Sequence, residues 1–356
     1  MENQIKNLVE QYFPADAIDS IKQFGKRVII TLHNIAEDET KASELKAALA
    51  SLEGIDKVSV IFTADKKPQG LKPEADDKWT VPGVKKIIAV ASGKGGVGKS
   101  STAINIALQF RKQGKRVIIF DADFGLANIE VMFGIIPKYT LADLMFKGRD
   151  LKDIITEGPE GVMFVSGGSG IARLVNLDNE QIKRLVYKMA ELEQMADVIV
   201  IDTGAGISKS VLEFVAASPE VILVTTPEPT SITDSYALLK ALAMDEGFDK
   251  NTTRINIVTN KVTSRSESIN IYDKLSAVVK RFLFIDLEYL GEVPQDSAIT
   301  KAIMKQKPVS ITYPNSASAK AFVEISENLD SGEHKVPNQK KGVIGFFSKV
   351  FTAGRR

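Results

Sequence analysis

From residue 85 onward, the sequence alternates between short, continuous apolar runs and longer amphipathic segments. Runs that are apolar throughout suit strands buried on both faces, as in a parallel sheet. The alternation therefore predicts a doubly wound α/β fold with a mostly parallel sheet and right-handed crossovers. We expect strands at Ile87–Ala91, Val117–Phe120, Val162–Val165, Val198–Ile201, Val221–Val224, Ile255–Val258 and Leu287–Leu290. Helices are expected between them, for example at Ser101–Lys112, Glu180–Met195 and Ser231–Ala243.

Composition divides the 356 residues into further segments. Residues 1–63 predict a small α+β domain, with strands at Arg27–His33 and Val58–Phe62 and a helix at Glu44–Leu52. Residues 64–84 contain several prolines and many charges, which is typical of a linker. The α/β domain is expected to span 85–330, followed by a polar linker at 331–341 and an amphipathic segment at 342–356.

Charge and composition exclude several classes of function. The formal net charge of +1 argues against general nucleic-acid binding, so no specific nucleic acid is expected as a partner. The chain has no cysteine, which excludes disulfides, thiolate zinc sites and cysteine-ligated iron–sulfur clusters for the chain acting alone. The N-terminus is polar, and no apolar run is long enough to span a bilayer. We therefore expect a cytoplasmic protein.

A glycine-rich segment follows the first expected strand of the α/β domain. It carries the pattern Gly93-x-x-x-x-Gly98-Lys99-Ser100, which is the phosphate-binding loop of nucleoside triphosphatases. Glycines let backbone N–H groups surround phosphate oxygens, and the following helix adds its positive N-terminal end. Lys99 is expected to contact the β- and γ-phosphates and Ser100 to ligate Mg²⁺, which predicts ATP and Mg²⁺ as cofactors. The expected nucleotide-binding residues of the loop are Gly93, Lys94, Gly95, Gly96, Val97, Gly98, Lys99, Ser100 and Ser101.

Carboxylates follow two other expected strands. Asp121 and Asp123 come at the end of the second strand, and residues two apart on an extended segment point the same way. Asp202 follows the apolar run Val198–Ile201 and precedes a glycine-rich turn, as in a Walker B strand, where the aspartate holds Mg²⁺ through water. The carboxyl ends of parallel strands face the ligand crevice, so these groups predict a magnesium site there. Strand-end capping remains the alternative for Asp121 and Asp123.

The segment KGGVGKS adds a second lysine, Lys94, to the phosphate loop. This form resembles the deviant loop of the MinD/ParA class of ATPases. The resemblance extends over residues 85–330 and is strongest to the FlhG (YlxH) branch, through DADFGLANIEVMFG, VIDTGAGIS, VTTPEPTSITDSYALLK, LEYLGEVPQD and PVSITYPNSASAKAF. Members of that branch regulate the number and placement of bacterial flagella together with the GTPase FlhF.

The resemblance implies roles for individual residues. Lys94 would reach across a homodimer interface to the partner's nucleotide, although a solvated loop lysine is the alternative. Asp123 would position the hydrolytic water, while Asp121 would support the metal shell. Asn260 would bind adenine, with Pro294 and Asp296 in the loop beside the base; Asn260 could also be a simple turn residue. The catalytic group is thus expected to be Lys94, Lys99 and Asp123, with Ser100, Asp121 and Asp202 around the metal.

The N-terminal region departs from this branch. The branch usually begins with D-Q-A-x-x-L-R, of which only Gln4 and Leu8 remain here. ELKAALASLEGIDKVSVIFTADKKPQ and VPGVKKIIAVASGKGGVGKS resemble instead the front of the Mrp iron–sulfur carriers. This chain lacks the C-x-x-C pair and the D-I-Y-G-P segment of those carriers. A carrier or scaffold ATPase therefore stays the alternative function, beside a MinD-like division-site regulator.

The last segment, 342–356, predicts a basic amphipathic helix. Val343, Phe346, Phe347, Val350 and Phe351 fall on one helical face, and residues 331–356 carry an excess of lysine and arginine. Such a segment favours reversible binding to an anionic membrane surface, which places the protein at the inner face of the cell membrane. The alternative is a helix that docks on the protein's own core.

Overall fold

The computed structural model describes residues 86–123, 128–167, 185–245, 247–331 and 342–352 in the larger part of the chain. In the first 84 residues it describes residues 5, 8–9, 11–14, 17–24, 27–33, 39–50, 55, 57–63 and 84. The chain forms two compact units, Met1–Trp79 and Thr80–Arg356. The two expected linkers fall almost wholly outside the described residues, at 64–83 and 332–341.

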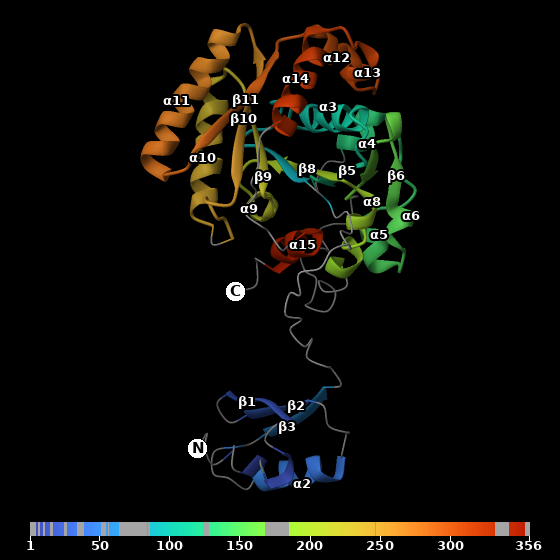
Figure 1. The fold of residues 1–356 in the computed structure, drawn as a ribbon, viewed down its shortest axis with the longest axis vertical. Helices are drawn as coiled ribbons and strands as arrows, with labels where there is room; N and C mark the ends of the chain where they lie inside the picture. Colours follow the sequence, from blue (N-terminus) through green and yellow to red (C-terminus); the bar gives the residue numbers. More distant parts are fainter. Residues whose placement is uncertain are drawn as a thin grey trace, which may run out of the picture. The chain divides into compact units, whose positions relative to one another are not determined.

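The first unit is a three-stranded sheet with helical segments (Figure 1). β2 (Arg27–His33) pairs antiparallel with β1 (Ile18–Phe24) and parallel with β3 (Lys57–Thr63). α2 (Glu39–Ala50) begins earlier than the sequence pattern predicts, and β1 was not expected. Only two residues separate β1 from β2, which is the usual length of a hairpin turn. The core of the unit consists of Ile5, Val9, Phe13, Val28, Ile30, Leu45, Leu49 and Ile55.

The second unit contains an eight-stranded sheet in the order β11-β10-β9-β4-β8-β5-β7-β6. All neighbouring strands are parallel except β6, which runs antiparallel at one edge. The predicted α/β sheet is thus present, although the edge strand β6 was not expected. The strands are β4 (Lys86–Ser92), β5 (Val117–Ala122), β6 (Ile155–Glu157), β7 (Met163–Val165), β8 (Val198–Ala205), β9 (Glu220–Thr225), β10 (Arg254–Val262) and β11 (Leu287–Pro294).

Helices cover both faces of this sheet (Figure 1). Successive side chains of a strand point to opposite faces of the sheet. Alternate residues of each strand therefore pack against the helices of one face or of the other. One face packs against α3 (Lys99–Lys112), α4 (Asn128–Phe133), α12 (Ser297–Met304), α13 (Val309–Thr312) and α14 (Ala317–Ser331). The other packs against α5 (Leu141–Phe146), α6 (Leu151–Ile154), α8 (Leu192–Met195), α9 (Lys209–Ala217), α10 (Pro229–Ala243), α11 (Arg265–Leu283) and α15 (Gly342–Thr352).

Two expected helices have different bounds in the structure. α3 begins at Lys99, two residues before the expected start, so the phosphate loop leads directly into it. α10 begins at Pro229, which suits the first turn of a helix because proline lacks the N–H that would be unpaired there. The first residues of the expected helix Glu180–Met195 lie outside the described residues, and α8 corresponds to its end.

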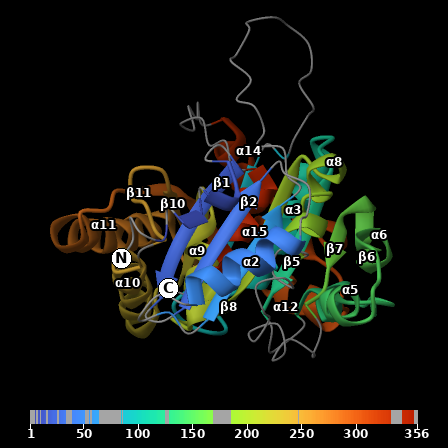
Figure 2. The same ribbon diagram turned by 90° about the horizontal axis from the view of Figure 1, so that it is seen from below.

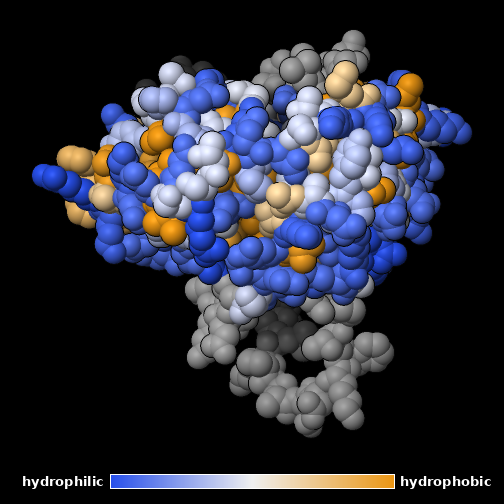
Figure 3. Space-filling model, turned by 90° about the horizontal axis from the view of Figure 1, so that it is seen from above, coloured by the Kyte–Doolittle hydropathy of each residue, from blue (hydrophilic) through white to orange (hydrophobic). Residues whose placement is uncertain are grey.

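The C-terminal helix α15 lies beside α9 on the sheet face that also holds α8 (Figures 1 and 2). Its apolar side is buried within the protein: Val343, Phe346, Phe347 and Val350 belong to the core cluster of this face. The docked arrangement that the sequence left open is therefore the one in this structure. No described helix is long and apolar enough to cross a bilayer. On the face drawn in Figure 3, hydrophobic residues lie in small groups among hydrophilic ones.

Candidate nucleotide site

The phosphate loop connects β4 to α3. Gly98 at the N-cap of α3 has a left-handed backbone, with φ of 91°, which glycine adopts without strain. A Cβ atom added there would lie 2.2 Å from Nδ2 of Asn260, so a larger residue would displace that side chain. Ser100 and Ser101 fall in the first turn of α3, where free backbone N–H groups and the helix dipole favour an anion.

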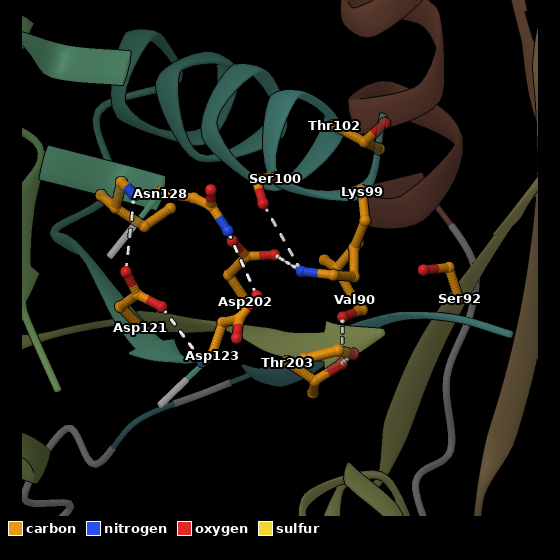
Figure 4. A network of polar contacts seen from close by, with 12 residues as sticks. Val90, Ser92, Lys99, Ser100, Thr102, Asp121, Asp123, Asn128, Asp202 and Thr203 are labelled. Carbon is orange, nitrogen blue, oxygen red and sulfur yellow. Dashed lines mark hydrogen bonds and ion pairs between the residues drawn. The ribbon is translucent and has the colours of Figure 1, made fainter. Parts of the chain in front are cut away.

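Lys99, the first residue of α3, and Asp202 of β8 form a buried ion pair (Figure 4). Lys99 Nζ lies 2.5 Å from Asp202 Oδ1 and 3.5 Å from Ser100 Oγ. Asp202 Oδ2 is buried and has no hydrogen-bond partner among the described residues. Burial raises the pKa of Asp202, while the charge of Lys99 acts in the opposite direction. The free oxygen fits a role as acceptor for a water bound to Mg²⁺, since Mg²⁺ keeps several waters when it binds to proteins.

Asp121 lies on the neighbouring strand, since β5 pairs with β8 and Asp121 is the register partner of Asp202. Its two oxygens accept hydrogen bonds from the backbone N–H groups of Asp123 (3.1 Å) and Ile129 (3.4 Å). Burial, followed by the nearby charge of Asp202, raises the pKa of Asp121 to about 8. Two neighbouring buried carboxylates repel each other when both are ionised, and a divalent metal would relieve that repulsion.

The structure also places Asp123 just beyond the end of β5. Asn128 donates a hydrogen bond of 3.2 Å from Nδ2 to Asp123 Oδ2, which fixes one carboxylate oxygen (Figure 4). Asn128 was not identified from the sequence, although its position five residues after Asp123 gave the only available signal. No group of three or more histidine, cysteine, aspartate or glutamate side chains suited to a metal occurs among the described residues. A P-loop magnesium site needs no such group, because serine, phosphates and water supply most ligands.

Lys94 is bound to two side chains at the start of α10. Its Nζ donates to Glu228 Oε2 at 2.6 Å and to Thr230 Oγ1 at 3.0 Å, both at the N-terminus of α10. The lysine also lowers the pKa of the Glu228 carboxyl through this hydrogen bond and its charge. Lys94 is therefore partnered in this structure, and the sequence pattern did not indicate Glu228 or Thr230.

The side chains expected around the base have structural partners of their own. Asn260 at β10 donates from Nδ2 to the Val97 carbonyl at 2.8 Å, and its Oδ1 accepts from the Lys261 N–H. The amide thus supports the phosphate loop in this structure, and a contact with adenine stays a prediction. Pro294 ends β11. Asp296 caps α12 by accepting from the Ala298 N–H.

Comparison with known proteins places this site in a family. Residues 83–330 match the family model described as "ParA: NUBPL iron-transfer P-loop NTPase". The chain belongs to the ParA/MinD family of P-loop ATPases. It is 41% identical to the antiactivator FleN of Pseudomonas aeruginosa over 261 residues, which cover 73% of this chain and 91% of FleN. It is 33% identical to the flagellum site-determining protein YlxH of Helicobacter pylori, over 74% of this chain and 89% of YlxH.

Solved structures agree on the fold. The septum site-determining protein MinD of Pyrococcus horikoshii, determined with Mg-ADP, matches with a TM-score of 0.56 and 24% identity. The match covers 69% of this chain and 96% of MinD. The predicted fold class and the assignment to the MinD/ParA ATPases, with FlhG-type relatives, are thus confirmed. The roles of individual site residues stay predictions.

Proposed function

We propose that this protein is an ATP-driven switch that controls the number or position of bacterial flagella. The observation that carries the proposal is the 41% identity to FleN, over 73% of this chain and 91% of FleN. The identity to YlxH supports the same conclusion. In this proposal, ATP joins two copies of the chain, and hydrolysis separates them.

The residues of the site support separate roles in binding and hydrolysis. Lys99 and the N-terminus of α3 would hold the phosphates, with Mg²⁺ held by Ser100 and by waters on Asp121 and Asp202. Bound Mg²⁺ would neutralise phosphate charge. Asp123, oriented by its hydrogen bond from Asn128, would position the attacking water. Lys94 would leave Glu228 and reach the nucleotide of the second subunit, where it would stabilise charge developing on the γ-phosphate.

The C-terminal helix would connect nucleotide state to location. Phe347 of α15 packs against Phe120 of β5, with ring centroids 5.4 Å apart, and Phe120 directly precedes Asp121. Phe346 packs against Phe214 of α9, the helix that follows the glycine-rich turn after Asp202. Changes at the metal site would thus reach the helix through the two elements on which it rests. Release of α15 would free its aromatic side for an anionic membrane, and the protein would act at the inner face of the cell membrane.

A carrier of iron–sulfur clusters is the second candidate, because the description of the matching family model includes iron transfer. The absence of any cysteine argues against it, since such clusters are normally held by cysteine thiolates. Reconstitution with iron and sulfide distinguishes the two: a bound cluster, seen by its visible absorbance, would favour the carrier.

The test of the switch uses cells that carry one altered copy of the gene. Replacing Asp123 by Ala should keep ATP binding, prevent hydrolysis and change the number of flagella per cell, counted by electron microscopy. A matched variant, Asp273→Ala, changes an exposed aspartate of α11 and should leave the count as in wild type. Normal flagella in the Asp123→Ala cells would refute the flagellar role. Co-purification of the GTPase FlhF tests the expected protein partner.

A further inference from the structure

Two consecutive residues of β10 hold two consecutive carbonyls of the phosphate loop. Asn260 Nδ2 donates a hydrogen bond of 2.8 Å to the Val97 carbonyl, and Lys261 Nζ donates one of 2.9 Å to the Gly96 carbonyl. The pairing of β10 with β9 ends at Thr259, so both residues extend beyond the end of β9. The two carbonyls therefore lie on the side of the phosphate loop that faces the end of β10.

The N–H groups of the same two peptides point the other way. A trans peptide is planar, so its C=O and N–H groups have opposite directions. The N–H groups of Val97 and Gly98 therefore face away from β10, and neither donates to an acceptor among the described residues. Gly96 and Gly98 have positive φ angles of 78° and 91°, whereas Val97 between them does not. Such an alternation turns successive N–H groups toward one concave side, which binds anions.

Lys261 has a backbone conformation that lysine disfavours. Its φ of 60° is left-handed, a region that glycine and asparagine tolerate better. Lys261 is also the extra residue of a β-bulge, because Asn260 pairs with Val293 and Val262 with Pro294 on β11. A bulge changes the direction of its side chain, and here the ammonium group reaches the phosphate loop. Strain of this kind persists only where the surrounding structure holds it, and it occurs often at functional sites.

We propose that Lys261 is a positioning residue that fixes the phosphate loop in the form that binds phosphate. Its ammonium group holds the Gly96 carbonyl on the outer side of the loop, so the Val97 N–H points towards the phosphates. Asn260 does the same for the next peptide. Donors that are oriented in advance raise affinity, because the loop needs no reordering when phosphate binds. The inference rests on ATP binding under the proposed function, and it relates Lys261 to the phosphates and not to the base.

Two other roles of a lysine at this position give different experimental results. A cation beside the loop attracts anions through its charge alone, and salt screens that attraction. A side chain that contacts the base affects the binding of nucleotides and leaves the binding of inorganic phosphates unchanged. Positioning of the loop acts on every ligand that carries the phosphates, persists at high salt, and alters the Val97 and Gly98 amides of the free protein.

The test is calorimetric titration of the full chain with ATP and with inorganic tripolyphosphate. Lys261→Met removes the donor and keeps the length of the side chain, so it should weaken both ligands by a similar factor of about three to ten, at low and at high salt. Lys261→Arg keeps a donor and should recover most of the affinity. Lys274→Met, a change at an exposed lysine of α11, is the matched control and should bind both ligands as wild type does. Turnover by Lys261→Met should show a raised KM and a nearly unchanged kcat, because the loop binds the ground state and the transition state alike.

Two further measurements separate positioning from a merely structural role. In NMR spectra of the free protein, the Val97 and Gly98 amide resonances should move in Lys261→Met and return in Lys261→Arg. Lys261→Gly relieves the backbone strain without restoring the donor. Its midpoint of urea unfolding should therefore exceed that of Lys261→Met, while its affinity for ATP should be equally weak.

Several outcomes would overturn the proposal. If Lys261→Met weakens ATP but not tripolyphosphate, Lys261 contacts the base and does not shape the loop. A loss of affinity confined to low salt would leave only an effect of charge, and wild-type affinity for ATP in Lys261→Gly would show that the ammonium group is not needed. A wild-type protein that binds neither ligand would instead refute the nucleotide site of the proposed function, and this inference with it. Circular dichroism of each variant verifies that the fold is kept.

Discussion

Lys99 Nζ lies 2.5 Å from Asp202 Oδ1, and both side chains are buried in the nucleotide site. The pair joins the residue that follows the phosphate loop to the middle of β8. Under the proposed function, Lys99 must move to the phosphates and Asp202 to the metal waters, so nucleotide binding replaces one set of charge interactions by another. The same ion pair therefore affects both the stability of the free protein and its affinity for ATP.

Replacement of Lys99 by alanine should abolish ATP binding, because the phosphates lose their main side-chain cation. It should also destabilise the free protein, since removing one partner of a buried ion pair costs about 3–5 kcal/mol. Calorimetric titration with ATP and urea unfolding measure the two effects. The double variant Lys99→Met, Asp202→Asn should recover much of the stability and none of the binding. ATP affinity equal to wild type in Lys99→Ala would disprove the assignment.

Asp123→Ala should bind ATP but turn it over at a rate lower by a factor of about 100 or more, as expected when a general base or water-positioning group is removed. The variant should then accumulate as a dimer with ATP, which light scattering detects. Asn128→Ala is the companion change: it removes the hydrogen bond to Asp123 and should lower turnover less than Asp123→Ala does. Normal turnover by a monomeric Asp123→Ala protein would contradict this role.

The fold followed from the sequence because its strands are apolar on both faces, a pattern that few other structures produce. β6 was missed because the edge strand has three residues and no distinctive pattern. The phosphate loop was found from its glycine and lysine pattern, and the three aspartates were found because each comes after an apolar run of a buried strand. Glu228 and Thr230 were not located, because they meet Lys94 from a segment that is distant in the sequence. Asn128 was not located, because the sequence does not show that its side chain turns back to Asp123.

Lys94 provides a test of the dimer. Lys94→Ala should bind ATP nearly as wild type does, while the ATP-dependent dimer weakens. Glu228→Gln should have the opposite effect on the dimer, because it removes the charge that holds Lys94 against α10. Solvent screens this partly exposed pair, so the gain in dimerisation should be small. Analytical ultracentrifugation with ATP measures both variants. If neither change affects dimerisation, Lys94 is only a loop lysine bound to its neighbours.

Asp121 should make the metal-free protein less stable as the pH rises. Its pKa is about 8 in the folded protein against 3.8 as the reference value, so the folded protein retains a proton that the unfolded chain releases. Stability from this group is complete below about pH 4, falls between pH 4 and 8, and is lost above that range. Asp121→Asn removes the effect, so its stability relative to wild type should increase with pH over this window. Urea unfolding at pH 5.5 and 8 in the presence of a chelator measures it, and an equal difference at both pH values would contradict it.

The docked C-terminal helix allows membrane binding to be separated from helix release. Deleting residues 342–356 should keep ATP binding and abolish co-sedimentation with anionic vesicles. Phe347→Glu should also abolish it, but this change removes a buried contact with Phe120 as well, so it does not separate the two steps.

Glu193→Ala separates membrane binding from the release of α15. Glu193 of α8 accepts a hydrogen bond of 2.7 Å from the Val343 N–H in the first turn of α15, so it holds the docked helix without belonging to the helix's apolar side. Loss of this charge-assisted bond should weaken docking by about 1–3 kcal/mol and leave the membrane-binding face unchanged. Glu193→Ala should therefore bind anionic vesicles without ATP, where the wild type needs ATP, and salt should weaken the binding. Glu191→Ala, a change at an exposed residue two positions away whose side chain makes no hydrogen bond or ion pair with α15 among the described residues, is the matched control. If Glu193→Ala needs ATP as much as wild type does, docking of α15 does not restrain the helix, and the coupling proposed between nucleotide and membrane fails.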